Sequence, residues 1–263
     1  MKNFDFHRPQ SVADAVTLLR GNDAAKLLAG GQSLLPVMKL DLAQPSAVVS
    51  LGAIRALREI RDGDPLVIGA LVTHDEVSTS PAVRQRIPGL AALAGGIGDA
   101  QVRNRGTVGG SIAHADPAAD YPAAVLALGA MIETDRRRIT ADDFFTGLFT
   151  TALAPDEIVT AVHFPVPERA AYSKFASPAS KYALVGVMVA KTAGGVRVAV
   201  TGAGPKAFRV PAWESALAAS FSPAAISPAV VAPGDLRSDG EASAEYRAHL
   251  VTVMARRAVQ ACQ

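Results

Sequence analysis

A pair of glycines flanked by hydroxyl residues lies near the middle of the chain, in the segment Thr107-Val108-Gly109-Gly110-Ser111. Glycine has no Cβ atom, so the backbone of such a segment can come close to a ligand and present its N–H groups. Ser111 adds a hydroxyl that can donate a hydrogen bond. This combination of amides and hydroxyls predicts a site that binds phosphate groups.

An acidic residue follows this segment at the predicted start of a helix. Asp120 opens the run DYPAAVLALGA, in which Pro122 favours a first helical turn and the apolar residues favour a buried helix. An ionised carboxylate accepts hydrogen bonds and donates none, so it suits the sugar hydroxyls of a nucleotide better than its phosphates. We therefore expect Asp120 to bind a sugar hydroxyl beside the phosphate site.

A second glycine pair lies near the N-terminus, in the segment KLLAGGQSLLP over residues 26–36. Gly30-Gly31 follows a short apolar run and precedes Gln32, Ser33 and a predicted short helix. Two separate glycine segments suit a dinucleotide. Neither matches the G-x-G-x-x-G dinucleotide fingerprint or the Gly-Lys-Ser/Thr ending of a nucleotide triphosphatase loop.

Three segments together carry a family resemblance: AGGQSLLPVMKL, QVRNRGTVGGSIAHADPAADYP and SAEYRAHLVTVMARRA. They resemble the FAD-binding medium subunits of bacterial molybdenum hydroxylases. That group includes the medium subunits of carbon monoxide dehydrogenases and the flavin domain of xanthine dehydrogenase. The motifs occur in matching order and at matching separations, and the resemblance covers essentially the whole chain.

The resemblance implies an α+β fold, in which a two-subdomain FAD-binding module is followed by a small antiparallel sheet with covering helices. It also implies which residues bind FAD. The pyrophosphate is assigned to Ala29, Gly30, Gly31, Gln32, Ser33, Thr107, Val108, Gly109, Gly110 and Ser111, a sugar hydroxyl to Asp120, and the flavin end to Val159 and Lys174. A cation such as Lys174 near the flavin would favour the negative charge that develops on reduction. The alternative for Lys174 is a solvated lysine on a strand.

The chain departs from its relatives at two places. Ser111 stands where xanthine dehydrogenases have Asn, which shortens the hydrogen-bonding side chain. The segment from Ser177 to Tyr182 replaces a stretch that contains Arg in many relatives, so the group that packs on the flavin is left open. Tyr182 is a candidate for that contact.

The function implied by the resemblance is that of an FAD-carrying electron-transfer subunit of a heteromeric molybdenum hydroxylase. Such a subunit passes electrons from iron–sulfur clusters in a partner chain through FAD to an external acceptor. The implied partners are a small subunit with two [2Fe–2S] clusters and a large subunit with a molybdopterin cofactor. The single cysteine, Cys262, agrees with this division, because an iron–sulfur cluster needs four thiolate ligands.

Two other functions stay open on the residues alone: a free-standing FAD oxidoreductase with its own small-molecule substrate, and a nucleotide-binding scaffold without redox turnover. A catalytic triad of Ser111, His114 and Asp116 is disfavoured, because hydrolase triads draw their members from separated elements. The segment 202–207 formally matches G-x-G-x-x-A, but Pro205 removes one of the N–H groups that such a loop uses. We expect no catalytic residue and no metal ligand in this chain.

Composition further limits the classes of protein to which the chain can belong. The 263 residues are 49% hydrophobic and carry a net charge of only +2, which predicts a packed protein rather than a disordered or nucleic-acid-binding one. The one basic cluster, Arg136-Arg137-Arg138, has no interleaved aromatic residues and is predicted to be a solvated turn between strands. No apolar run is long enough to span a membrane, and no signal-peptide pattern is present, so a cytoplasmic location is expected.

Prolines at alternating positions in Phe164–Glu168 predict a linker, because proline cannot donate to a sheet ladder. We therefore expect an FAD-binding domain over residues 1–166, with subdomains of about 1–55 and 56–166, and a C-terminal α+β domain over 167–263. Periodicity predicts helices over 11–20, 34–40, 82–94 with a break or kink near Pro88-Gly89, 211–219 and about 242–261. It predicts strands over 25–29, 47–51, 131–134, 157–164, 171–176, 184–191 and 196–201.

Overall fold

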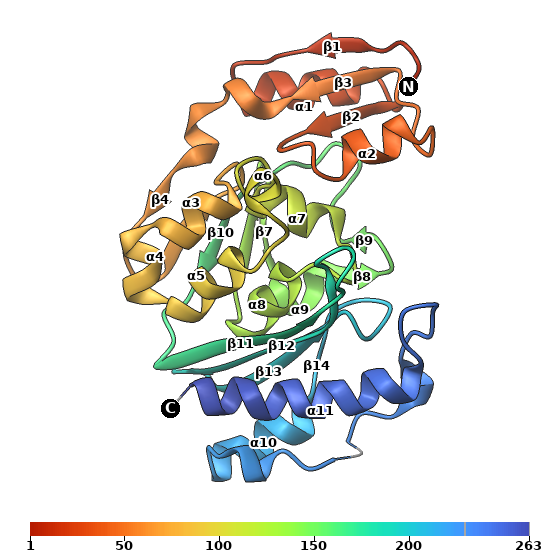
Figure 1. Cartoon of the computed structure of the whole chain (residues 1–263). Coiled ribbons are helices and arrows are strands. Elements are labelled where there is room, and N and C mark those ends of the chain that lie inside the picture. Colours follow the sequence, from red (N-terminus) through yellow and green to blue (C-terminus); the bar gives the residue numbers. More distant parts are fainter. Residues whose placement is uncertain (229, 263) are drawn as a thin grey trace.

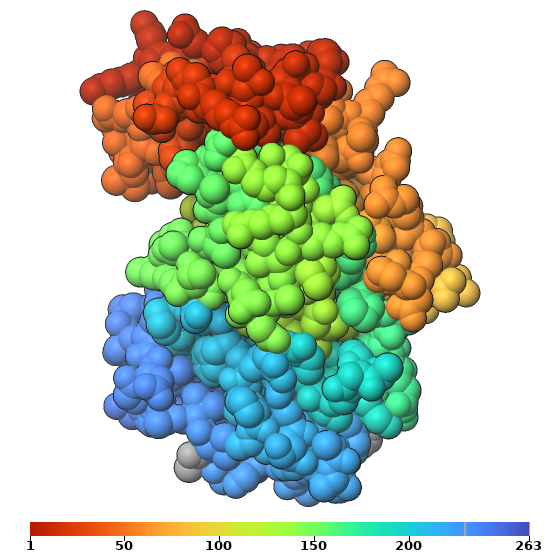
Figure 2. Space-filling model, turned by 180° about the vertical axis from the view of Figure 1, so that it is seen from behind, coloured from red at the N-terminus to blue at the C-terminus, as the bar shows by residue number. Residues whose placement is uncertain are grey.

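The computed structural model describes residues 1–228 and 230–262, and the chain forms three layers in sequence order. Figure 1 shows the N-terminal layer at the top, a middle layer in which helices surround an antiparallel sheet, and the C-terminal sheet with its helices at the bottom. Figure 2 shows the same three layers from behind, stacked on one another in red, green and blue.

The N-terminal layer is a three-stranded parallel sheet in the order β1-β3-β2, with two helices. Its elements are β1 (Asp5–His7), α1 (Val12–Arg20), β2 (Ala25–Leu28), α2 (Leu34–Lys39), β3 (Ala47–Ser50) and the 3₁₀ helices η1 (Leu51–Ala53) and η2 (Arg55–Arg58). The predicted helices and strands of this layer are confirmed. Strand β1 was not predicted, since three residues are too few to show a period.

The middle layer is built on a five-stranded antiparallel sheet in the order β4-β5-β10-β6-β7. The strands of this sheet are β4 (Ile60–Arg61), β5 (Leu66–Gly69), β6 (Met131–Thr134), β7 (Arg138–Thr140) and β10 (Val159–Phe164). A separate two-stranded sheet is formed by β8 (Phe145–Gly147) and β9 (Thr150–Thr151). The helices of the middle layer are α3 (His74–Thr79), α4 (Pro81–Arg86), α5 (Pro88–Gly95), α6 (Ala100–Arg103), α7 (Val108–His114), α8 (Tyr121–Ala127) and α9 (Ala141–Phe144). The helix predicted over 82–94 is interrupted at Ile87, because Pro88 starts a new helix.

The C-terminal layer is a four-stranded antiparallel sheet in the order β11-β12-β13-β14, as the α+β prediction requires. Its elements are β11 (Arg169–Ala176), β12 (Ala183–Thr192), β13 (Gly195–Thr201), β14 (Phe208–Arg209), α10 (Pro211–Ala219), α11 (Ala244–Ala261) and the 3₁₀ helices η3 (Pro223–Ala225) and η4 (Pro233–Asp235). Helices α10 and α11 cover one face of this sheet, and α5 and α8 pack on the other.

Helix α8 lies at the centre of the largest hydrophobic core. All of its residues from Tyr121 to Ala127 are buried, as its apolar sequence predicts. The same core contains Met188 and Ala190 from β12 and Ala199 from β13. The segment between β10 and β11 therefore connects the middle sheet to the C-terminal sheet, and one hydrophobic core contains residues from both layers.

The turn between β6 and β7 is anchored to the start of β10 by ion pairs. Glu157 is 4% exposed, accepts two hydrogen bonds of 2.8 Å from Arg137, and accepts a third from the Thr134 hydroxyl. Arg136 pairs with Asp156 at 2.9 Å. The basic cluster does connect two strands, as predicted. Arg136 and Arg137 form ion pairs with Asp156 and Glu157, however, so the turn is not fully solvated. These contacts hold the residues that precede Val159.

The Glu157 contacts predict a loss of stability in acid. The Arg137 guanidinium lowers the pKa of Glu157 from 4.5 to about 2. The folded pKa lies below the unfolded one, so the stabilisation is complete above about pH 4.5 and disappears as the pH falls toward 2. In urea unfolding at pH 7, Glu157→Gln should lower the free energy of unfolding by on the order of 2 kcal/mol, and the deficit should shrink by pH 3.

The matched control is Glu59→Gln, since the Glu59 side chain is 62% exposed and its ion pair with Arg61 is 3.8 Å long. That substitution should change the free energy of unfolding by less than about 0.5 kcal/mol. A Glu157→Gln deficit that stayed constant from pH 7 to pH 3 would contradict the assignment of a lowered pKa.

Candidate functional site

A cavity of about 590 Å³ lies between the N-terminal and middle layers and reaches the loop between β11 and β12. Residues from the loop after β2, from α7, from the start of α8 and from β10 line it. The residues predicted from the sequence that line it are Ala29, Gly30, Gly31, Gln32, Ser33, Thr107, Gly109, Gly110, Ser111, Asp120 and Val159. Val108 and Lys174 are not among the lining residues.

The loop after β2 presents unused backbone donors to this cavity. Among the described residues 1–228 and 230–262, no hydrogen-bond acceptor is found for the amides of Gly30, Gly31, Gln32 and Ser33. Gly31 has a φ of +77°, a conformation that favours glycine. A Cβ on Gly30 would overlap the backbone carbonyl of Arg105. The predicted presentation of free N–H groups is thus met in this loop.

The second glycine segment forms the first turn of α7 and uses its amides internally. Val108 donates to the Val72 carbonyl at 3.0 Å, Gly109 to the Ala70 carbonyl at 2.9 Å, and Gly110 to the Thr107 hydroxyl at 3.1 Å. The amides of Val108–Ser111 thus have acceptors within the chain, because the helix starts at Val108 and packs on the neighbouring backbone. The spacing of the residues does not reveal this packing. Phosphate binding by this segment stays a prediction.

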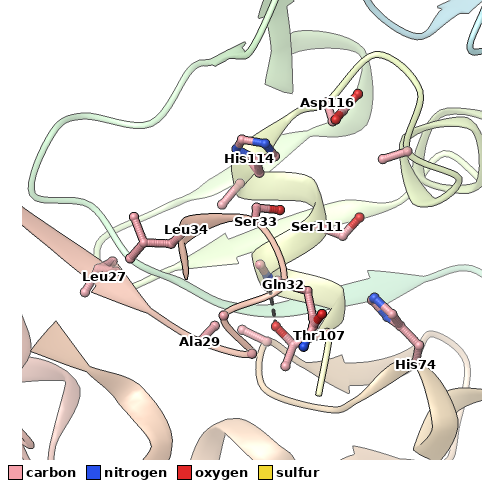
Figure 3. Close-up of a pocket in the computed structure, with 18 of the residues that line it drawn as sticks. Leu27, Ala29, Gln32, Ser33, Leu34, His74, Thr107, Ser111, His114 and Asp116 are labelled. Atoms are coloured by element: carbon pink, nitrogen blue, oxygen red, sulfur yellow. Dashed lines mark hydrogen bonds between the residues drawn. The ribbon is translucent and has the colours of Figure 1, made fainter. Parts of the chain in front are cut away.

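Glycine is needed in α7 for close packing and for space. A Cβ on Gly109 would lie 2.5 Å from the Cβ of Ala70, and a Cβ on Gly110 would lie 3.5 Å from the Cβ of Ala29. Gly110 is therefore where the two glycine segments face each other. Figure 3 shows Thr107, directly before α7, and Ser111 on α7 beside the loop that carries Gln32 and Ser33. α7 contributes the Ser111 hydroxyl and open space to the cavity.

Asp120 is the buried carboxylate of the cavity wall. It directly precedes α8, as predicted, and is 4% exposed. Burial raises its pKa, while Lys174 and Tyr172 act in the opposite direction. The carboxylate accepts a 2.5 Å hydrogen bond from the Tyr172 hydroxyl and lies 3.1 Å from the Lys174 ammonium.

Lys174 contacts Asp120 but is not itself a lining residue of the cavity. Its ammonium group also donates to the carbonyls of Gly96 at 2.8 Å and Lys181 at 3.1 Å. Its side chain is only 12% exposed, so it is not the solvated strand lysine considered as the alternative. Its three N–H donors all have partners within the chain.

The sequence did not single out His74, which also lines the cavity. His74 opens α3 after the Thr73 capping box, and its ring is 5% exposed. Burial, with a further contribution from Arg103, lowers its pKa to about 4, so the ring is neutral at physiological pH. The sequence around His74 indicates only the start of a helix. It does not indicate a cavity residue, because the cavity is lined by residues that are far apart in the sequence.

The apolar part of the lining was also missed as a site. It includes Leu27, Leu34, Leu71, Leu153 and Ile158, which the hydrophobic pattern marks only as ordinary interior residues. Tyr182, the candidate for flavin contact, lies at the cavity and is 44% exposed. Apolar walls with a few polar groups are typical of a small-molecule or cofactor site.

The three residues of the rejected triad do not form a hydrogen-bonded chain. Asp116 accepts from the Ala118 amide at 2.8 Å, and the His114 ring packs on Phe149 with centroids 5.2 Å apart. Within the described ranges, no hydrogen bond joins Ser111 to His114. The same ranges hold no group of three or more His, Cys, Asp or Glu side chains arranged for a metal ion, and no helix in them could cross a membrane.

The cavity fits an elongated ligand that carries phosphates, sugar hydroxyls and an apolar ring. The free amides from Gly30 to Ser33 suit phosphate oxygens, and the Ser111 hydroxyl can donate beside them. The Asp120 carboxylate can accept from a hydroxyl, and the apolar walls can bury a ring system. The residues present therefore fit FAD.

Comparisons with known proteins agree with this fit. Residues 2–167 match the family described as FAD binding domain in molybdopterin dehydrogenase. The nicotine 6-hydroxylase medium subunit of Paenarthrobacter nicotinovorans is 43% identical to the chain, over 95% of it and 94% of that protein. The carbon monoxide dehydrogenase medium chain of Hydrogenophaga pseudoflava is 37% identical, over 98% of the chain and 96% of the relative.

Solved structures extend the similarity to the fold. A carbon monoxide dehydrogenase from Hydrogenophaga pseudoflava matches with a TM-score of 0.92 and 37% identity, covering 99% of this chain and 97% of the solved one. The quinoline 2-oxidoreductase from Pseudomonas putida 86 matches with a TM-score of 0.90 and 29% identity, covering 100% and 98%. The α+β layers described above are thus those of a known fold.

Proposed function

The chain belongs to the family of FAD-binding domains in molybdopterin dehydrogenases, and we propose that it is the FAD-carrying electron-transfer subunit of a heteromeric molybdenum hydroxylase. The observation that carries the proposal is the 590 Å³ cavity, with the free amides of Gly30 to Ser33 on one wall and Asp120 on another. We keep the division into an FAD-binding part over 1–166 and a C-terminal part over 167–263 as part of the proposal.

Each group on the wall has one task. The amides from Gly30 to Ser33 bind the pyrophosphate, and Ser111 donates a further hydrogen bond to it. Asp120 accepts from a sugar hydroxyl, and Val159 forms part of the wall on β10. Lys174 compensates the charge of Asp120. The cofactor-binding set proposed is Ala29, Gly30, Gly31, Gln32, Ser33, Thr107, Val108, Gly109, Gly110, Ser111, Asp120, Val159 and Lys174.

Within this set, Val108 and Lys174 act without touching the cavity. Val108 anchors α7 through its hydrogen bond to Val72, and Lys174 holds Asp120. Bound FAD supplies the chemistry of accepting and releasing electrons. The chain binds FAD, orients it and excludes water from its apolar side.

The remaining redox centres must lie in other chains. Cys262 is the only thiol, and it is buried against the C-terminal sheet, so this chain offers no set of four thiolates. We assign the iron–sulfur clusters to a small partner subunit and the molybdopterin cofactor to a large one. Electrons then pass from the clusters through FAD to an external acceptor. The names of the relatives, medium subunit and medium chain, support this arrangement.

The free-standing FAD oxidoreductase is the weaker alternative. The relatives that match over more than nine-tenths of both chains are named as parts of larger enzymes, not as enzymes on their own. A scaffold without redox turnover is separated from both by a single spectrum. A bound flavin that dithionite reduces excludes the scaffold.

Replacing Gly110 tests FAD binding in the cavity. A Cβ at this position would lie 2.8 Å from the Thr107 hydroxyl and 3.5 Å from Ala29, so Gly110→Val fills the space between the two glycine segments. FAD affinity should fall by at least about tenfold, because close approach of the cofactor is blocked. The measurement is the flavin absorbance retained by the purified protein and the dissociation constant from fluorescence titration.

Gly240→Val is the matched control, since no atom lies within 4 Å of its added Cβ. The control should retain flavin like the wild type. Both variants should keep the wild-type circular dichroism spectrum. Full flavin occupancy in a folded Gly110→Val protein would overturn the assignment of the cavity as the FAD site.

Purification from the native cell tests the subunit assignment. The chain should co-purify with polypeptides that contain iron, acid-labile sulfide and molybdenum, because it cannot ligate these centres itself. Metal analysis and mass spectrometry of the isolated complex provide the measurement. Recovery of the chain as a lone, metal-free flavoprotein that fully oxidises its substrate would refute the subunit assignment and favour the free-standing enzyme.

A further inference from the structure

The Asp120 carboxylate is held by two side chains of a single strand in the C-terminal layer. Tyr172 and Lys174 both lie on β11, two residues apart, so they project from the same face of the sheet. The Tyr172 hydroxyl donates to Oδ1 of Asp120 at 2.5 Å, and the Lys174 ammonium lies 3.1 Å from Oδ1 and 3.2 Å from Oδ2. Strand β11 thus holds a residue of the cavity wall, although no residue of β11 lines the cavity.

The two carboxylate oxygens have different hydrogen-bond partners. Oδ1 accepts from the Tyr172 hydroxyl, and Oδ2 accepts from the Lys174 ammonium. A carboxylate offers about four acceptor positions, so both oxygens keep unused capacity. Asp120 lines the cavity. The Tyr172 hydroxyl is a permanent donor, because burial and the neighbouring carboxylate raise its pKa well above 10.

The hydroxyl of Tyr172 has a space made for it by the adjacent strand. Gly186 of β12 pairs with Lys174, and a Cβ built on Gly186 would overlap the Tyr172 hydroxyl oxygen. Any other residue at this position would push the phenol away from Asp120. The contact therefore depends on Gly186 of β12 as well as on Tyr172.

We propose that Tyr172 is a positioning residue for FAD, which orients the Asp120 carboxylate so that it accepts a hydrogen bond from a hydroxyl of the cofactor's ribose or ribityl chain. This inference rests on the proposed function, because it needs FAD in the cavity. It adds a side chain from the C-terminal layer to the binding of the cofactor. The same hydrogen bond helps to keep Asp120 ionised and able to accept.

Removing the hydroxyl has two expected effects. Tyr172→Phe keeps the ring but leaves Lys174 as the single donor to Asp120, so FAD affinity should fall about tenfold. The pKa of Asp120, raised by burial and opposed by Tyr172, should rise further. Acceptance needs the ionised form, so the midpoint of FAD release on acidification should move to a higher pH. Fluorescence titration and a pH series measure the two effects.

The titratable side chains coupled to Asp120 come from three elements. Lys174 and Tyr172 from β11 lower the pKa of Asp120, whereas the Asp120 carboxylate raises the pKa of Tyr121 at the start of α8 and of Tyr182 in the loop before β12. Of these, only Tyr172 changes in the variant. Tyr246→Phe is the matched control, because Tyr246 is 44% exposed on α11 and does not line the cavity. It should leave both affinity and pH midpoint unchanged.

A double-mutant cycle separates positioning from a general loss of structure. If Tyr172 acts through Asp120, then Tyr172→Phe should have little further effect on FAD affinity in an Asp120→Asn background. Affinity losses that simply multiply would overturn the inference, as would a Tyr172→Phe protein with wild-type affinity and pH midpoint. A merely structural role would not produce the coupling.

Gly186→Ala reaches the same contact from β12 and keeps the test decisive if Tyr172→Phe folds poorly. It should also weaken FAD binding and raise the pH midpoint, while Tyr172 itself is intact. Wild-type FAD binding by a folded Gly186→Ala protein would contradict the inference. Failure of the wild-type chain to bind FAD at all is a different result, which would overturn the proposed function itself.

Discussion

The structure depends on backbone surfaces that come too close to admit a side chain. Gly30 packs against the carbonyl of Arg105, Gly109 packs against Ala70, and a Cβ on Gly106 would lie 2.5 Å from the His74 ring. The first of these contacts joins the N-terminal layer to the middle layer, and the other two lie within the middle layer beside the cavity. Because two layers share the lining, neither forms the site alone. This constraint explains why glycine occupies these positions in the sequence.

The C-terminal layer contributes to the site through two side chains of β11 that contact Asp120. Burying a carboxylate such as Asp120 is costly unless it is paired and hydrogen-bonded, and the partners come from β11. Lys174 also binds the carbonyls at the end of α5 and in the loop before β12. One ammonium group therefore ties together α5, α8 and the C-terminal sheet. The hydrophobic core around α8 also continues into β12 and β13.

Local patterns predicted much of this structure. The helix α1, the buried helix α8, the strands β12 and β13 and the free amides from Gly30 to Ser33 all follow from neighbouring residues. Features set by distant contacts were not predictable in the same way. The amides of α7 are used because Val72 and Ala70 lie against them, and the ammonium group of Lys174 is bound by Asp120 and two carbonyls. His74 became a wall residue only through tertiary packing.

The central claim is that the free amides of the first glycine loop bind the phosphates of FAD, while α7 provides space and a hydroxyl. Amide hydrogen exchange with and without FAD tests it most directly. The amides from Gly30 to Ser33 should exchange rapidly in the FAD-free chain and at least about tenfold more slowly with FAD, because binding gives them acceptors. The amides from Val108 to Ser111, already hydrogen-bonded, should change little. Protection confined to Val108–Ser111, with Gly30–Ser33 unchanged, would contradict the account.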